Sequence, residues 1–268
     1  MSAIDQLFSR LKASGKKALM PFLTAGDPDL DFTAAAIAEM VARGAQLCEV
    51  GIPYSDPIAD GPVIQASYTR ALAGKIKLAQ ILEMLGRTGP KVSAPLVTMV
   101  SYAIILRHGL ERYVDEARAA GVAGAIVPDL LVEESAELAA VCRKADFSLV
   151  QLVTPTTPRQ RALRIAEAST GFLYYVSVTG ITGERTALPQ SLIDNVGWLR
   201  EQTPTPVCIG FGISRPEHVR LLSPVADGLI VGSAIVRRAA QAAERPRQEV
   251  LAELGDYVAS LVAAFEAK

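Results

Sequence analysis

The stretch that decides the fold is Gln46-Leu47-Cys48-Glu49-Val50-Gly51-Ile52, a short apolar run that carries one carboxylate. Runs of this length and character are typical of buried parallel strands. Seven more occur along the chain, at 18–23, 95–101, 123–127, 147–153, 172–176, 207–210 and 228–231. Amphipathic helical patterns separate them, including Phe32–Arg43, Leu110–Ala120 and Glu133–Lys144. Eight alternating strand and helix units predict an α/β fold, a closed (β/α)8 TIM barrel.

Three further helices extend this repeat. Met1–Leu11 predicts an extra N-terminal helix, the long second unit leaves room for an inserted helix around Leu78–Leu85, and Gln248–Ala267 predicts a final helix. No linker divides the chain, so we expect residues 1–268 to form one barrel domain. An open doubly wound sheet is the structural alternative, but its dinucleotide-binding form needs GxGxxG after the first strand, and that motif is missing.

Composition excludes several classes of protein. The 27 Lys and Arg are balanced by 28 Asp and Glu, for a net charge of −1. The chain therefore lacks the excess of positive charge that is typical of nucleic-acid-binding proteins. The most apolar stretch, Ala94–Leu106, is shorter than the roughly 20 residues that span a bilayer. Three scattered cysteines indicate a reduced, cytoplasmic chain. With only His108 and His218, neither in a zinc-site spacing, we expect no metal site and no histidine-based triad.

Two carboxylates are the candidate catalytic residues. Strand alternation places Leu47, Glu49 and Gly51 on one face, so Glu49 is predicted to point into the barrel mouth, where apolar neighbours raise its pKa. A structural ion pair is the alternative, yet the inner halves of the strands carry no Lys or Arg. Asp60 lies in the proline-rich loop after this strand and can overhang the same mouth, or be a solvated turn residue.

The last two strands end in Gly210-Phe211-Gly212-Ile213-Ser214 and Val231-Gly232-Ser233-Ala234. Loops in these positions recurrently bind phosphate in this fold, because glycines let backbone N–H groups approach an anion. The pair of loops therefore predicts a phosphorylated substrate. The polar, glycine-rich segment 177–189 after the sixth strand suits a lid, although an ordinary surface loop is equally compatible with it.

The reaction class follows by elimination. No lysine stands at a strand end, so a Schiff-base nucleophile is lacking, and carboxylate proton transfer remains. Apolar and aromatic residues near the strand ends would suit the flat part of a substrate, although core packing explains them as well. These are Phe22, Ile64, Met99, Tyr175 and Phe211.

The chain resembles the α subunit of tryptophan synthase over nearly its whole length. The second of the following blocks is long enough to be highly specific. The matching blocks are PFLTAGDP at 21–28, EVGIPYSDPIADGPVIQ at 49–65, VPD at 127–129, TGITG at 179–183, GFGIS at 210–214 and GSAIV at 232–236.

The resemblance implies cleavage of indole-3-glycerol phosphate, with Glu49 as the acid and base and Asp60 as the acceptor of the indole N–H. It implies a phosphate cradle of Gly183, Gly212, Gly232 and Ser233, with Thr182 meeting Asp60 when the lid closes. Pro53 and Asp56 match positions near the β-subunit surface of an α2β2 complex. No cofactor is implied for this chain, because pyridoxal phosphate belongs to the partner β subunit.

Two other readings of the sequence are a noncatalytic barrel that only scaffolds a partner, and another barrel enzyme that acts on a phosphorylated metabolite, such as an isomerase. Retention of Glu49, Asp60 and the glycine loops argues against the scaffold.

Overall fold

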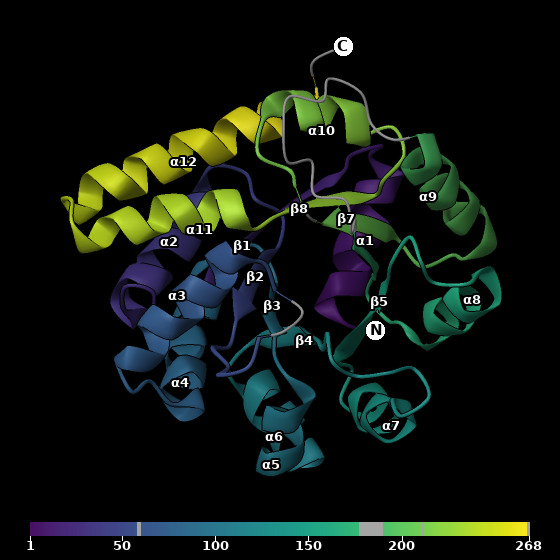
Figure 1. Cartoon of the computed structure of the whole chain (residues 1–268), viewed down its shortest axis with the longest axis horizontal. Coiled ribbons are helices and arrows are strands. Elements are labelled where there is room, and N and C mark those ends of the chain that lie inside the picture. Colours follow the sequence, from purple (N-terminus) through teal and green to yellow (C-terminus); the bar gives the residue numbers. More distant parts are fainter. Residues whose placement is uncertain (58–59, 177–189, 211, 267–268) are drawn as a thin grey trace.

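The computed structural model describes residues 1–57, 60–176, 190–210 and 212–266. Within these ranges eight parallel strands pair in sequence order, and the last pairs with the first to close a barrel (Figure 1). The strands are β1 Ala18–Thr24, β2 Cys48–Gly51, β3 Leu96–Met99, β4 Val122–Ile126, β5 Ser148–Val153, β6 Leu173–Val176, β7 Val207–Gly210 and β8 Gly228–Val231. The predicted (β/α)8 barrel is therefore confirmed, and the open sheet is excluded.

Helices surround the barrel (Figure 1). They are α1 Ala3–Ala13, α2 Leu30–Ala42, α3 Pro62–Ala73, α4 Leu78–Thr88, α5 Tyr102–His108, α6 Leu110–Ala119, α7 Ala136–Lys144, α8 Arg159–Ala168, α9 Gln190–Gln202, α10 Pro216–Leu222, α11 Ser233–Ala239 and α12 Arg247–Ala263, with short 3-10 helices η1 Gly89–Lys91 and η2 Ala240–Ala243. Both predicted additions are present, α1 before the first strand and α4 between α3 and β3. No helix in the described part of the chain combines the length and apolar character that crossing a membrane requires.

Helix α2 begins two residues earlier than its apolar pattern predicts. The side chain of Asp29 accepts a hydrogen bond from the backbone N–H of Phe32 at 2.8 Å. This N-terminal cap stabilises a first turn that starts at Leu30, before the amphipathic repeat begins.

Strand alternation divides the core into two apolar clusters. The inner cluster fills the barrel and contains Leu47, Val97, Ile126 and Val150. The outer cluster lies between the strands and the helices and is the larger of the two. Side chains that point inward therefore meet other strands, and only those near the carboxyl ends of the strands can reach the barrel mouth.

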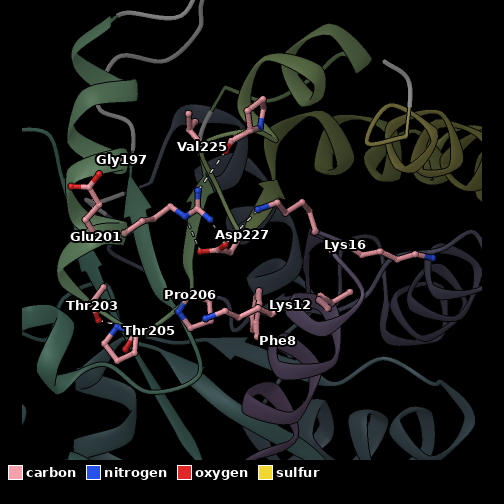
Figure 2. A pocket seen from close by; sticks show the side chains of 16 residues that line it. Phe8, Lys12, Lys16, Gly197, Glu201, Thr203, Thr205, Pro206, Val225 and Asp227 are labelled. Atoms are coloured by element: carbon pink, nitrogen blue, oxygen red, sulfur yellow. Dashed lines mark hydrogen bonds and ion pairs between the residues drawn. The ribbon is translucent and has the colours of Figure 1, made fainter.

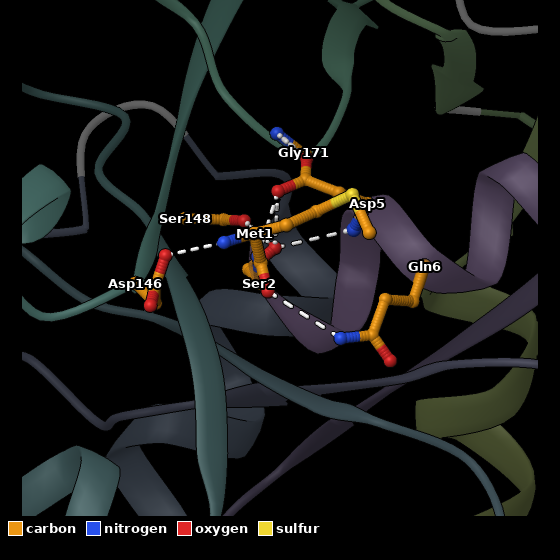
Figure 3. A network of polar contacts seen from close by, with 7 residues as sticks. All are labelled: Met1, Ser2, Asp5, Gln6, Asp146, Ser148 and Gly171. Carbon is orange, nitrogen blue, oxygen red and sulfur yellow. Dashed lines mark hydrogen bonds and ion pairs between the residues drawn. The ribbon is translucent and has the colours of Figure 1, made fainter.

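Helix α1 covers the opposite end of the barrel. Its buried side chains Ile4, Leu7 and Phe8 belong to the inner cluster, and the Phe8 ring lies 5.8 Å from that of Phe172. Polar contacts fix the helix in place, as Figure 3 shows. The Ser2 and Ser148 hydroxyls are 2.7 Å apart, and the N–H of Gly171 donates to Asp5 at 3.1 Å. The amino end of the barrel is thus closed by a helix whose polar groups are paired.

The three cysteines are free and buried. Cys208 on β7 belongs to the inner cluster, whereas Cys48 on β2 and Cys142 on α7 belong to the outer one. Burial raises the pKa of the Cys48 and Cys142 thiols to about 12.

Candidate active site

Glu49 lies on β2 with its side chain inside the barrel. The strand register places it beside Phe22 on β1 and Val97 on β3, two members of the inner cluster. The residue is 1% exposed, and neither carboxylate oxygen has a hydrogen-bond partner among the described residues. The predicted inward orientation is confirmed, and the alternative, a structural ion pair, is not found among the described residues.

This environment changes the protonation of Glu49. Burial raises the pKa of its carboxyl group to about 8, and the nearby charge of Asp60 adds to the effect. A carboxyl group in such a site is mostly protonated at neutral pH, because burial and a nearby negative charge both disfavour the charged form. Glu49 can therefore deliver a proton.

Asp60 follows β2 on the loop that leads into α3, and its backbone is fixed by two hydrogen bonds. Its N–H donates to the carbonyl of Pro57 at 3.1 Å, and the side chain of Gln65 donates to the Asp60 carbonyl at 2.8 Å. Partial burial raises the pKa of the Asp60 carboxyl group to about 6. Asp60 thus remains mostly ionised at neutral pH while Glu49 is mostly neutral, which is the division that acid and base chemistry needs.

Glu49 and Asp60 line the same cavity, whose volume is about 300 Å³. The structure therefore brings together the two carboxylates and most of the predicted pocket residues. Those that line this cavity are Phe22, Ile64, Met99, Gly212, Gly232 and Ser233. Arg237 of α11 also lines it, and it is the only cation among the described lining residues. The sequence analysis did not single out Arg237, because arginines on an amphipathic helix usually face solvent.

Gly51, two residues after Glu49, keeps the inner face of β2 free of a side chain. A Cβ atom there would lie 2.5 Å from Cζ of Phe22 and 2.8 Å from the hydroxyl of Tyr68. Contacts under 3 Å of this kind require the neighbours to move. Glycine at this position therefore allows the Phe22 and Tyr68 rings to pack against the strand that carries Glu49.

The two glycine loops contribute backbone to the cavity. Gly212 has φ +79°, a conformation that favours glycine. Gly232 precedes α11, and its carbonyl accepts the N–H groups of Ile235 and Val236 at 2.8 and 3.1 Å. The N–H groups of Ser233 and Ala234 precede those in chain order and have no intrahelical acceptor. These donors, with the cation of Arg237, fit an anionic group.

A second cavity of about 400 Å³ shares Asp60, Met99 and Tyr174 with the first. Its remaining walls are largely apolar and suit a flat ring; they include Pro128, Leu130, Leu152 and Val176. The prediction that Tyr175 forms a pocket wall is corrected here. Tyr175 belongs to the outer cluster, and Tyr174 lines both cavities, because neighbouring residues on β6 point to opposite faces.

The remaining predicted site residues divide into two groups. Thr182, Gly183 and Phe211 lie outside the described residues, as does the whole of the predicted lid at 177–189. Pro53 is buried, so this chain presents little of it to a partner, whereas Asp56 is exposed and accepts a hydrogen bond from the Ser55 hydroxyl at 2.6 Å.

A larger cavity, of about 600 Å³, lies at the other end of the barrel (Figure 2). Lys17, Pro206 and Asp227, which line it, directly precede the first residues of β1, β7 and β8. Asp227 accepts hydrogen bonds from Arg200 at 2.8 and 3.2 Å and from the N–H of Val207 at 2.9 Å. Its carboxylate is therefore a structural ion-pair partner, and this cavity is not the candidate active site.

In the described part of the chain, no group of three or more His, Cys, Asp or Glu could hold a metal ion.

Comparison of the sequence with known families gives one consistent result. The family model described as tryptophan synthase alpha chain matches residues 8–263. A tryptophan synthase alpha chain from Rhodopirellula baltica is 60% identical over 277 residues, covering 100% of both chains. One from Prochlorococcus marinus is 49% identical over 243 residues, covering 90% of this chain and 88% of the relative.

Solved structures agree with the sequence relatives. Tryptophan synthase subunit alpha from Legionella pneumophila superposes with a TM-score of 0.90 at 33% identity, and the match covers 99% of each chain. The aminoacrylate-bound tryptophan synthase of M. tuberculosis gives a TM-score of 0.87 at 28% identity, covering 99% of this chain and 100% of that one.

Proposed function

The chain belongs to the tryptophan synthase alpha chain family, and from this premise we propose that Glu49 and Asp60 carry out its reaction. That reaction is the lyase step of tryptophan biosynthesis, the retro-aldol cleavage of indole-3-glycerol phosphate to indole and glyceraldehyde 3-phosphate. The observation that carries the proposal is the placement in one cavity of Asp60, the glycine loops and a buried Glu49 that has no hydrogen-bond partner among the described residues.

The first step uses the proton of Glu49. Its neutral carboxyl group protonates C3 of the indole ring, and the positive charge that develops on the ring is stabilised by the ionised Asp60, which accepts the indole N–H. The raised pKa of Glu49, about 8, and that of Asp60, about 6, give both groups the required charge at neutral pH.

The second step returns the proton. Glu49, now a carboxylate, accepts the proton of the hydroxyl group on the carbon attached to C3. As that carbon becomes an aldehyde, its bond to C3 breaks and the bonding electrons return to the ring. Indole and glyceraldehyde 3-phosphate result, and Glu49 is again protonated. Glu49 gives one proton to C3 and takes one proton from the hydroxyl group. The proposed reaction therefore needs no cofactor in this chain.

The two cavities accommodate the two parts of the substrate. The glycine loops and Arg237 would hold the phosphate, since backbone donors and a cation favour an anion. The apolar walls around Met99, Leu152 and Tyr174 would hold the indole ring. Three residues line both cavities and would lie where the indole ring joins the glycerol phosphate: Asp60, Met99 and Tyr174.

The partner is the β subunit of tryptophan synthase, and we expect an α2β2 complex in the cytoplasm with pyridoxal phosphate only on β. The loop between β2 and α3 carries exposed Asp56 as well as Asp60. Gln65 of α3 donates to the carbonyls of both Pro57 and Asp60, at 3.3 and 2.8 Å, so displacement of this loop would move Asp60. Docking of a partner on the loop would therefore change the catalytic geometry.

Indole release from indole-3-glycerol phosphate tests the function. We expect slow release by the chain alone and a clear gain in rate when its cognate β subunit is added. A chain that releases no indole under either condition contradicts the lyase proposal. Association without a change in rate leaves the lyase assignment standing and contradicts the coupling through Asp60.

A further inference from the structure

The C-terminal helix α12 reaches one of the glycine loops from outside the barrel. The hydroxyl of Tyr257 donates a hydrogen bond to the backbone carbonyl of Ser214 at 3.0 Å. Ser214 lines the cavity that holds Glu49 and Asp60, and it lies two residues after Gly212. Helix α12 also lies beside α11, which begins at the other glycine loop (Figure 1). A residue far from the site in sequence therefore holds the loop after β7.

Arg238 connects the same tyrosine to the first turn of its own helix α11, which follows the loop after β8. Its guanidinium carbon lies 3.6 Å from the centroid of the Tyr257 ring, within the range of a cation–π contact. Its Nη1 donates to the backbone carbonyl of Ala234 at 2.9 Å. Among the described residues, no carboxylate lies within salt-bridge distance of Arg238, so its observed contacts are the ring and this carbonyl. A continuous chain of contacts therefore runs from Ser214 through Tyr257 and Arg238 to Ala234.

Ser214 is also held from its other backbone group. Its N–H donates to Nδ1 of His218 on α10 at 3.2 Å. Burial, together with the charge of Arg215, lowers the pKa of His218, which leaves Nδ1 free to accept. Both backbone groups of Ser214 thus have partners on helices outside the barrel, which fixes the peptide that enters the cavity.

We propose that Tyr257 and Arg238 are positioning residues that hold the two glycine loops at the separation that binds the substrate phosphate. The proposal rests on the proposed function, in which these loops receive the phosphate. Anion binding by backbone donors depends on the donors being fixed before the anion arrives, since any ordering of loops on binding lowers affinity. The contacts of Tyr257 and Arg238 supply that order from outside the site.

The adjacent residues Arg237 and Arg238 then have different roles. Arg237 lines the cavity, whereas Arg238 contacts Tyr257 and the Ala234 carbonyl. Replacing Arg237 removes a charge from the site itself. Replacing Arg238 leaves the lining side chains intact and removes the contact between α12 and the helix that begins at Gly232.

The test compares Tyr257→Phe and Arg238→Gln with the unchanged chain. Tyr257→Phe keeps the ring and its contact with Arg238 and removes only the hydroxyl. The dissociation constant of inorganic phosphate is measured by titration calorimetry on the chain, and kcat and KM for indole-3-glycerol phosphate are measured in the complex with β. Loss of one hydrogen bond predicts about a three- to tenfold rise in the phosphate dissociation constant and in KM, with kcat unchanged.

Two controls separate this effect from a general loss of stability. Arg159→Gln removes a similar contact elsewhere, since Arg159 lies 4.8 Å from the centroid of the Trp198 ring, and it should change neither constant. The double variant of Tyr257 and Arg238 should lose less than the product of the single losses, because both substitutions interrupt the same chain of contacts.

Unchanged phosphate affinity in both variants, or a fall in kcat without a rise in KM, would overturn the positioning role and leave the lyase assignment intact. An unchanged chain that releases indole but binds no inorganic phosphate would overturn the phosphate assignment of the loops and the positioning role with it.

Discussion

At the carboxyl ends of the strands, Glu49 is buried with both oxygens unpartnered among the described residues. At the amino ends, Asp227 accepts three hydrogen bonds, two from Arg200 and one from the N–H of Val207. Glu49 lies within β2 and Asp227 directly precedes β8 of the same barrel, so the fold itself does not decide which one is paired. A buried acid without a partner destabilises a protein, and it persists where chemistry uses it. Under the proposed function, the end of the barrel with Glu49 carries the reaction, and the end with Asp227 stabilises the fold.

The largest expected difference between the ends is in catalysis. Glu49→Gln keeps the size of the side chain and removes its proton, so kcat should fall by about 10² to 10⁴ while substrate affinity stays close to that of the unchanged chain. Asp227→Asn, the matched change at the other end, should leave kcat unchanged. Single-turnover measurements with both variants test this, and a Glu49→Gln enzyme within a few-fold of normal turnover removes Glu49 from the mechanism.

The pH profile sharpens the role of the reacting end. The proposed reaction requires Asp60 ionised and Glu49 protonated, so kcat/KM should rise through about pH 6 and fall through about pH 8. The two limbs are not independent, because the charge of Asp60 contributes to the raised pKa of Glu49. Asp60→Asn should lower the rate by about 10²-fold and abolish the rising limb. A profile that is flat from about pH 5 to 9 would show that neither ionisation controls the reaction.

Stability should change in opposite directions at the two ends. The pKa of Glu49 is higher in the folded chain, about 8, than its usual 4.5, so the folded chain is penalised as pH rises above 4.5, and the penalty is complete near pH 8. Glu49→Gln should therefore raise the free energy of unfolding by about 1 to 3 kcal/mol at pH 8, with the difference fading toward pH 4.5. Asp227→Asn should lower it by about 1 to 2 kcal/mol. Urea unfolding of both variants measures these values, and equal signs would contradict the comparison.

The smallest expected effect is on KM, when a side chain is introduced at Gly232 in the candidate phosphate site. A Cβ atom at Gly232 would lie 3.9 Å from the nearest heavy atom, Cβ of Phe22, so Gly232→Ala fits without strain. Its methyl group should raise KM for the phosphorylated substrate a few-fold, because it occupies the approach to the backbone donors, and leave the melting temperature unchanged. Gly232→Val should raise KM further. Steady-state kinetics check both, and an unchanged KM in the valine variant would place the phosphate elsewhere.

The barrel and its two carboxylates could be predicted from the sequence because each depends on a local pattern. The eight apolar runs are short and alternate with helical patterns, and a single Glu within one of them indicates which face of β2 points inward. Asp60 lies in the loop that follows this strand, so it could be predicted to lie near the same mouth, although the spacing also allowed a solvated turn residue.

Other parts of the site depend on information that local patterns lack. In Leu173-Tyr174-Tyr175-Val176 all four residues are apolar or aromatic, so alternation alone does not indicate which tyrosine points inward. The contacts of Tyr257 and Arg238 depend on how α12 packs across α11, which the amphipathic pattern of a helix leaves open. Arg237 enters the cavity for the same reason.

The three buried cysteines allow local unfolding of the barrel to be measured by their reaction with thiol reagents. Thiol reagents attack the thiolate, and burial raises the pKa of Cys48 and Cys142 to about 12, so reaction at these sites requires local or global exposure. Cys208 reports on the interior of the barrel, Cys48 on the layer outside β2, and Cys142 on the packing of α7. Labelling rates of the unmodified chain therefore distinguish the detachment of one helix from the separation of the strands.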